Sequence, residues 1–193
     1  FFFHPYSGFG DPLWSRGLGD VYKRQAEDPD KMFDYKEDVA DQIAEKGIYV
    51  DATVATGYMR TFRDPDFDEE QARMFRDPGE RADILQDMRK RGVKFVSGID
   101  SGMLYVRFGD IAYTPERMVD VIGMGNMEAI VACTKTSAEC LDVDKETGTI
   151  DEGKSADIIV VDGNPNDDIK ALHNISTVML RGNIVKEDGK ELI

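Results

Sequence analysis

The stretch KFVSGIDSGM, residues 94–103, combines a strand pattern with an acidic residue held between glycines. Residues 94–97 are typical of a short buried strand, and residues 98–102 are typical of the loop at its carboxyl end. The carboxyl ends of parallel strands are where α/β enzymes keep catalytic and metal-binding groups. Asp100 is therefore the first candidate functional residue, and the question is which partners the chain supplies for it.

The segments before this strand alternate between helix and strand patterns. Apolar residues between Val39 and Ala44 recur at helical spacing, and a run of β-branched and apolar residues follows Gly47. The patterns predict a helix over 35–46, a strand over 48–54, a long polar loop over 55–77, a helix over 78–90 and a strand over 93–97. The loop is longer than connectors usually are, which favours a flap or active-site loop. The alternation predicts an α/β fold with parallel strands.

The segments after the strand change from helices to short strands. A helix is expected to start at Thr114, with Thr114 as its N-cap and Pro115 at its first position, and further short helices are expected over 127–134 and 137–141. Beyond Asp142, turns rich in Gly, Asn and Pro separate strands predicted over 148–150, 156–161, 178–181 and 184–185. Residues 181–183 have the pattern of a hairpin turn. The tail is thus predicted to be a small β-rich unit appended to the α/β part.

Composition excludes several classes of partner. The net charge of -14 argues against nucleic acid, because phosphate binding needs a basic surface. The chain has no run of about 18 apolar residues, so a membrane-spanning helix is not expected. Cys133 and Cys140 have neither zinc-ligand nor disulfide spacing, which favours two half-buried thiols in a reducing compartment and a cytoplasmic protein.

Residues 1–25 differ from the rest of the chain. They contain its only Trp and one of its two histidines, and they show neither helical nor strand periodicity. The run SRGLGDVYKRQ at their end resembles the translated sequencing-adapter stretches found at broken ends of assembled reading frames. We expect a non-native leader here; the alternative is a mobile aromatic arm.

A longer stretch carries a family resemblance. Residues 134–172 contain a Gly-x-Ile-x-x-Gly-Lys-x-Ala-Asp segment that begins at Gly148 and ends at Asp157, followed by an apolar run and Asp162. This segment resembles the C-terminal signature of the metal-dependent amidohydrolases, and the closest branch is the imidazolonepropionase and prolidase-like enzymes. GIDSG, residues 98–102, is similar to the family's Gly-Thr-Asp-Ser-Gly, with Ile99 in place of Thr. YVDAT, residues 49–53, is similar to the preceding strand, from which Asp51-Ala52 departs.

The resemblance implies a (β/α)8 TIM-type barrel with a small β-sandwich domain, and a site with one or two divalent metals, usually zinc. It implies that Asp100 is both a metal ligand and the acid that moves protons, since the metal acidifies a water and a carboxylate carries its proton to the leaving nitrogen. The second candidate in the signature, Lys154, is better explained by a structural role where a strand begins, as is Asp157.

The histidines that the resemblance implies are absent from this chain. His4 lies in the suspected leader, and His173 is interpreted as a surface or packing residue. Catalytic zinc needs about three protein ligands, so Asp100 cannot hold it alone. We therefore interpret the chain as a fragment: a leader over 1–25, the C-terminal portion of the barrel over 26–142, and strands of the β-sandwich over 143–193.

The parent protein is expected to hydrolyse C–N bonds of a small-molecule substrate, and the fragment to be inactive and without bound metal. Two alternatives stay open: a metal-free family member that serves as a binding or assembly subunit, and an unrelated α/β protein that resembles the family only in its tail. Asp100 itself could simply cap its loop. Tyr58, Arg60 and Arg63, in the predicted loop, are the candidate substrate-binding residues.

Overall fold

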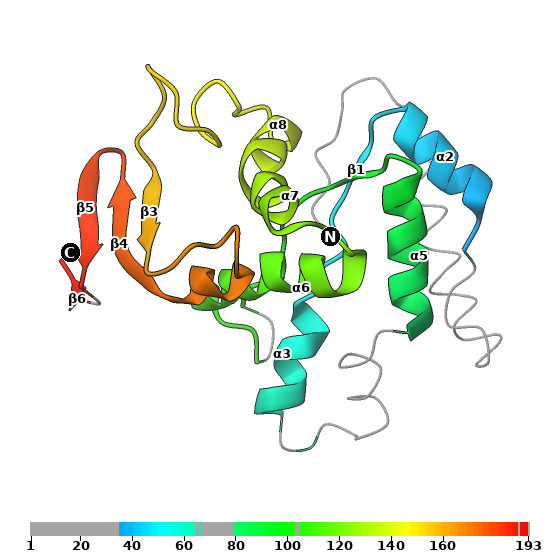
Figure 1. Ribbon diagram of the computed structural model, residues 1–193, viewed down its shortest axis with the longest axis horizontal. Coiled ribbons are helices and arrows are strands. Elements are labelled where there is room, and N and C mark those ends of the chain that lie inside the picture. Colours follow the sequence, from blue (N-terminus) through cyan, green and yellow to red (C-terminus); the bar gives the residue numbers. More distant parts are fainter. Residues whose placement is uncertain (1–34, 65, 67–78, 103–104, 189, 193) are drawn as a thin grey trace.

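The computed structural model describes residues 35–64, 66, 79–102, 105–188 and 190–192. The predicted leader over 1–25 lies outside these residues, as do Pro78 and most of the second half of the predicted loop. The described part contains a helical portion around two parallel strands and a separate antiparallel sheet at one end of the molecule (Figure 1). Within these residues, no helix is long and apolar enough to cross a membrane.

The two parallel strands form the centre of the helical portion. Strand β1 (Tyr49–Val50) pairs with β2 (Lys94–Phe95), with Tyr49 opposite Lys94 and Val50 opposite Phe95. The parallel pairing confirms the expected strand–helix–strand arrangement, because parallel neighbours need a crossover connection. Both strands are shorter than predicted, although the Val96 amide, just beyond β2, still donates a hydrogen bond to the Val50 carbonyl of β1 at 3.0 Å.

Helices cover one face of this strand pair. Val50 and Phe95 point to the same face and join a core with Leu85, Met118 and Ile122. Met118 and Ile122 are almost completely buried, and each such side chain contributes about 1.5–3 kcal/mol of transfer free energy. The helices that supply this core are α2 (Glu37–Glu45), α5 (Gly79–Lys90), α6 (Tyr113–Ile122) and α7 (Asn126–Val131).

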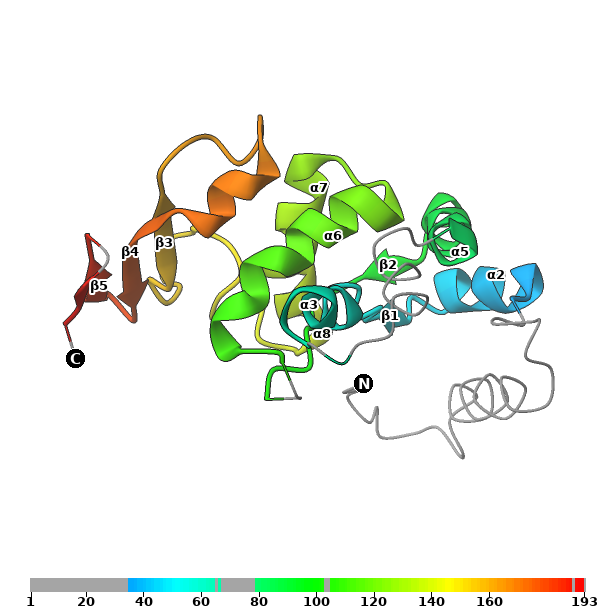
Figure 2. The ribbon, with the colours of Figure 1, turned by 90° about the horizontal axis from the view of Figure 1, so that it is seen from below.

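The predicted loop over 55–77 is wrong in its first part. Residues 56–63 form helix α3 (Thr56–Arg63), which packs through Met59 against Ala55, Ile99 and Val106. The sequence of this helix is polar on average, so its apolar positions are too few to reveal it by count; Met59 and the ring of Tyr58 are what it buries. Figure 1 and Figure 2 both show α3 next to α6.

Helix α6 begins earlier than expected. A 3-10 helix, η1 (Phe108–Ala112), leads directly into it, and its N-cap is Ala112. The assignment of Thr114 as the cap is therefore wrong: Thr114 lies inside the first turn, where its hydroxyl is buried without a hydrogen-bond partner among the described residues. Pro115 is tolerated there because first-turn N–H groups have no helical acceptor.

The helices predicted over 127–134 and 137–141 form one continuous helical segment. Helix α7 runs through a π-helical turn, η2 (Ala132–Thr136), into α8 (Ser137–Cys140). The Ser137 hydroxyl donates to the Ala132 carbonyl at 2.7 Å and accepts from the Ser97 amide at 3.1 Å. The wider π turn thus places Ser137 against the end of β2.

The antiparallel sheet confirms the predicted β-rich tail. Its strand order is β3 (Ile158–Val161), β4 (Ile175–Leu180), β5 (Asn183–Glu187) and β6 (Lys190–Glu191). Arg181 and Gly182 both have positive φ in the predicted hairpin turn, as a two-residue turn of this kind requires. The strand predicted over 148–150 is wrong, since these residues form a bend, and β6 was not predicted.

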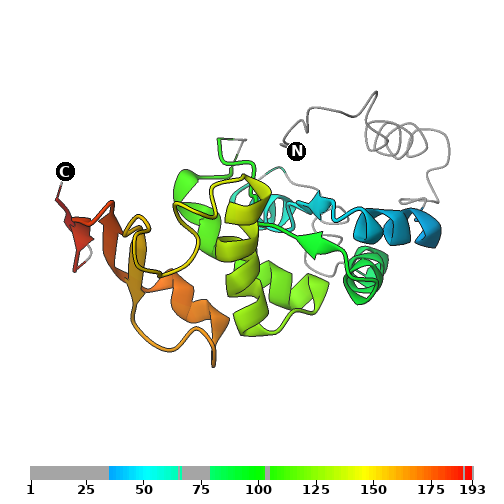
Figure 3. The same cartoon turned by 90° about the horizontal axis from the view of Figure 1, so that it is seen from above.

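The sheet joins the helical portion through a short 3-10 helix, η3 (Ile169–His173), which contacts α6. Figure 3 shows the sheet at one end and α2 with α5 at the other, with α6 to α8 between them.

Candidate functional site

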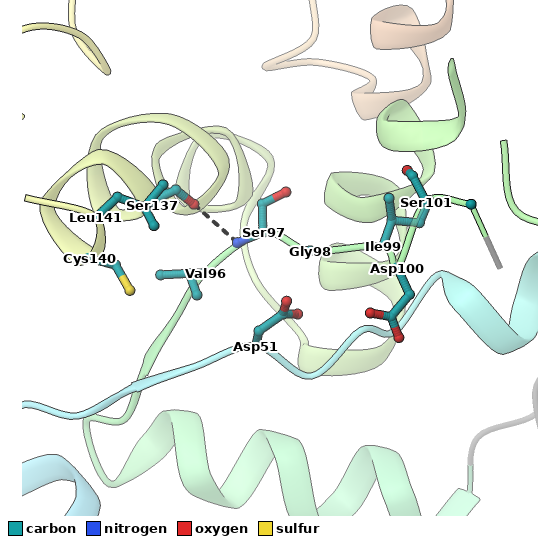
Figure 4. A pocket seen from close by; sticks show the side chains of 11 residues that line it. Asp51, Val96, Ser97, Gly98, Ile99, Asp100, Ser101, Ser137, Cys140 and Leu141 are labelled. Carbon is teal, nitrogen blue, oxygen red and sulfur yellow. Dashed lines mark hydrogen bonds between the residues drawn. The ribbon is translucent and has the colours of Figure 1, made fainter. Parts of the chain in front are cut away.

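Asp100 lies in the loop that leaves β2. It lines a pocket of about 680 Å³ together with the rest of residues 96–102. Asp51 closes the pocket from the end of β1, and Ser137, Cys140 and Leu141 close it from α8 (Figure 4). The position at the carboxyl end of a parallel strand agrees with the prediction made for Asp100.

The pocket contains a second carboxylate that the sequence reasoning missed. Asp51 follows β1 directly, and its side chain lies across Gly98, where a Cβ would come within 2.6 Å of the Asp51 Cγ. Its Oδ1 accepts a hydrogen bond from the Thr53 amide at 2.8 Å. The sequence patterns place Asp51 inside the strand predicted over 48–54 and not at its carboxyl end, so the rule that carboxyl ends of parallel strands meet at one edge of a sheet did not point to it.

The surroundings of Asp51 change the pKa of its carboxyl group. Burial raises the pKa of Asp51, and the nearby charge of Asp100 raises it further, while the Thr53 amide opposes both effects. Among the described residues that line the pocket, two are acidic and none is basic. The described wall therefore has a negative potential, which suits a cation or a substrate with a positive group.

The candidate substrate-binding residues are all on α3, and the described pocket wall includes none of them. The Arg63 guanidinium forms a two-point ion pair with Asp110, and the Arg63 Nη1 also donates to the Tyr105 carbonyl at 3.0 Å. The Tyr58 ring lies 4.3 Å from the Arg117 guanidinium carbon and packs edge-on against Phe62. Arg60 belongs to the same helix. Their role in substrate binding stays a prediction.

The amidohydrolase family profile matches residues 20–185 of the chain, which is most of its length. The match includes the strand pair, the pocket and most of the antiparallel sheet. The chain belongs to the amidohydrolase family. The comparison with curated proteins gave no match. The family membership rules out the interpretation as an unrelated protein that resembles the family only in its tail.

Solved structures of amidohydrolase-type enzymes resemble the chain. A Xaa-Pro dipeptidase with methionine bound in its active site is 29% identical, with a TM-score of 0.63 over 77% of this chain and 37% of that one. A putative prolidase from Bifidobacterium longum is 28% identical, with a TM-score of 0.63 over 75% and 37%. A prolidase in complex with N-methylphosphonate-L-proline is 25% identical, with a TM-score of 0.64 over 79% and 38%. The chain therefore spans less than two-fifths of the length of these relatives.

The described part of this amidohydrolase chain does not by itself form a metal site. It contains no group of three or more His, Cys, Asp or Glu side chains placed to hold an ion. Asp51 and Asp100 supply oxygen ligands of the kind that divalent metals accept, but two carboxylates fall short of the three protein ligands of catalytic zinc. Any metal centre that includes Asp100 needs further ligands.

The thiols and the histidine are not arranged for catalysis. Burial raises the pKa of Cys133 to about 11 and also raises the pKa of Cys140, so both thiols are protonated at neutral pH and are poor nucleophiles. The His173 Nε2 lies 2.8 Å from a carboxylate oxygen of Glu116, and its ring packs against Tyr113. His173 thus fastens η3 to α6, as expected for a packing residue.

The signature residues in the tail have structural contacts. The Asp157 carboxylate accepts a hydrogen bond from the Arg181 amide at 2.8 Å, which fixes the β4–β5 turn against the start of β3. The Lys154 ammonium bonds to the Thr149 hydroxyl and lies 3.4 Å from an Asp151 carboxylate oxygen. These contacts agree with the interpretation that this segment shapes the beginning of a strand.

Proposed function

We propose that this chain is the C-terminal part of a larger hydrolase of C–N bonds, whose substrates are dipeptide-like molecules of the kind that prolidases cleave. Family membership supports the hydrolase class, and the similar structures are a Xaa-Pro dipeptidase and prolidases. The length of these relatives supports the larger parent protein. In that parent, the strands β1 and β2 would be the last two of a (β/α)8 barrel, and β3 to β6 would belong to a β-sandwich domain.

The observation that carries the proposal is the position of Asp100. It stands at the carboxyl end of β2, in a glycine-flanked loop, and lines a pocket large enough for a small molecule. A carboxylate at this point can accept a proton from an attacking water and return it to the leaving nitrogen, which is what cleavage of an amide-type bond requires.

In the parent, Asp100 would be one ligand of a divalent metal, which supplies an acidified water when bound. The described residues contain no complete site, so such a metal needs further ligands. Our expectation that the chain alone is inactive and holds no catalytic metal stays a prediction.

The test uses the full-length protein that contains this sequence, loaded with zinc and assayed on a panel of Xaa-Pro dipeptides. Hydrolysis should be lost on chelation and restored by metal, and Asp100→Asn should lower kcat by about 10³-fold or more. Asp83→Asn, on the exposed face of α5, is the matched control and should leave kcat unchanged. A full-length protein that binds dipeptides without cleaving them would instead support the binding-subunit alternative.

A further inference from the structure

Helix α3 contacts the loop that carries Asp100. Thr56, the first residue of the helix, donates a hydrogen bond from its hydroxyl to the Ile99 carbonyl at 2.9 Å. That carbonyl belongs to the peptide group that joins Ile99 to Asp100. The hydroxyl therefore acts on the backbone one bond away from the candidate catalytic residue.

The Ile99 side chain is held by the same part of the chain. It is 5% exposed and packs in a small cluster with Ala55, Met59 and Val106. Ala55 immediately precedes α3, and Met59 lies one turn after Ala55. Two contacts therefore hold Ile99: its side chain packs in the apolar cluster, and its carbonyl accepts the hydrogen bond from Thr56.

Asp100 needs this support because of its backbone conformation. Its φ is +52°, in the left-handed region, which aspartate adopts more readily than most residues other than glycine but still at a cost in backbone energy. Such a conformation persists only where the surroundings determine it, and it is typical of functional positions. On the other side of the loop, the Asp51 carboxylate lies against Gly98, so the loop is held from both directions by the segment that follows β1.

We propose that Thr56 is a positioning residue, which holds the loop 98–102 so that the Asp100 carboxylate is presented to the pocket. The proposal rests on the proposed function for the importance of Asp100, but the contact itself can be tested separately. A hydroxyl at the start of a helix is a fixed hydrogen-bond donor, which a flexible loop could not provide. Through this donor, α3 would set the position of the Asp100 side chain in the loop after β2.

The chain offers matched variants. Thr56→Val removes the hydroxyl and keeps the shape, whereas Thr56→Ser keeps the hydroxyl. Thr61→Val is the control, because the Thr61 hydroxyl donates to the Tyr58 carbonyl at 2.8 Å in the same helix and does not contact the loop.

The first measurement is made by NMR on the full-length protein that contains this sequence. The Asp100 ¹³Cα and ¹³Cβ shifts report its φ, and exchange of the Gly102 amide, which donates to the Val106 carbonyl at 3.1 Å, reports opening of the loop. We expect Thr56→Val to move the Asp100 chemical shifts away from the values of a left-handed residue. Hydrogen exchange of the Gly102 amide should become about fivefold faster, because the loop has lost the stabilisation of one hydrogen bond. Thr56→Ser should restore both, and Thr61→Val should change neither. Unchanged shifts and exchange in Thr56→Val would overturn the proposal.

The second measurement is made on the full-length hydrolase. Thr56→Val should lower kcat about tenfold or more with KM within about twofold, because misplacing a catalytic group affects the chemical step more than binding. Thr56→Ser should recover most of kcat. A full-length enzyme that depends on Asp100 but is indifferent to Thr56→Val would overturn the positioning role. If the wild type cleaves nothing, the proposed function fails, and the NMR result alone decides whether Thr56 holds the loop.

Discussion

Gly98 shows how one residue without a side chain shapes the pocket. The Asp51 carboxylate occupies the space that a Cβ would need, with the Asp51 Cγ at 2.6 Å from that position. Asp51 has little freedom to move aside, since its short side chain is bonded to the Thr53 amide. The glycine is therefore required by close approach and not by backbone conformation.

We expect Gly98→Ala to destabilise the chain by about 1–3 kcal/mol, the usual cost of overpacking a closely packed position. Asp51→Ala should remove the obstacle, so the double variant should recover much of the loss, as coupled neighbours do. Gly109→Ala is the control, because a Cβ there would meet nothing within 4 Å. Urea unfolding followed by circular dichroism measures the wild type and the four variants. Equal costs for Gly98→Ala with and without Asp51 would contradict this account.

At the scale of elements, Asp110 connects α3 to η1. It is 5% exposed, accepts two hydrogen bonds from the Arg63 guanidinium and one from the Arg107 amide, and these donors lower its pKa. A lowered pKa in the folded state means that the ionised carboxylate stabilises the fold. This stabilisation is complete above the unfolded value near pH 4 and is lost as the pH falls through the lowered value.

The variant Asp110→Asn should therefore lower the free energy of unfolding by about 1–3 kcal/mol at pH 7. The difference from the wild type should shrink at pH 3, because this pH lies below the unfolded value and the unfolded chain then binds a proton at this carboxylate. Urea unfolding at both pH values measures this, and Asp83→Asn, exposed on α5, serves as the control for lost charge. A difference of the same size at both pH values would show that charge is not the cause.

The elements differ in how much of them could be predicted. Helix α2, strand β3 and the β4–β5 hairpin have strong local signals: apolar residues at helical spacing, a continuous apolar run and a Gly-containing turn. Helix α3 has only a short signal: Tyr58, Met59 and Phe62 stand at helical spacing, but the helix is polar on average and buries mainly Met59. Its existence depends on tertiary contacts with Ile99 and Asp110, which a local pattern cannot express.

The residues of the candidate site also differ in whether the sequence could predict them. Asp100 was predicted from the glycines around it and from the downstream signature. Asp51 was not, because the strand predicted over 48–54 includes it, and its place at the carboxyl end of β1 is clear only from the pairing of β1 with β2. The contact of Ser137 with the Ser97 amide depends on a π-helical turn, for which the sequence has no recognised pattern.

At the scale of the molecule, the described residues leave the antiparallel sheet without a buried face. None of the described residues of β3 to β6 is buried, and Val160 and Leu180 are each more than 50% exposed, as is Leu192 just after β6. Antiparallel sheets in stable domains normally pack one face on a core. An exposed apolar sheet is expected for a part of a larger protein whose remaining segments would cover it.

We therefore expect the chain alone to bind 1-anilinonaphthalene-8-sulfonate in native buffer and to self-associate as its concentration rises, because apolar sheet surface and free strand edges favour both. Ile159→Thr combined with Leu180→Thr, at two exposed positions on one face of the sheet, should reduce the dye fluorescence without changing the circular dichroism spectrum. Val39→Thr, at an exposed apolar position on α2, should have a smaller effect on the dye. The full-length protein should bind little dye, since the same surface would be buried there. A chain that binds no dye, stays monomeric and melts in a sharp, reversible transition would contradict the interpretation as part of a larger fold.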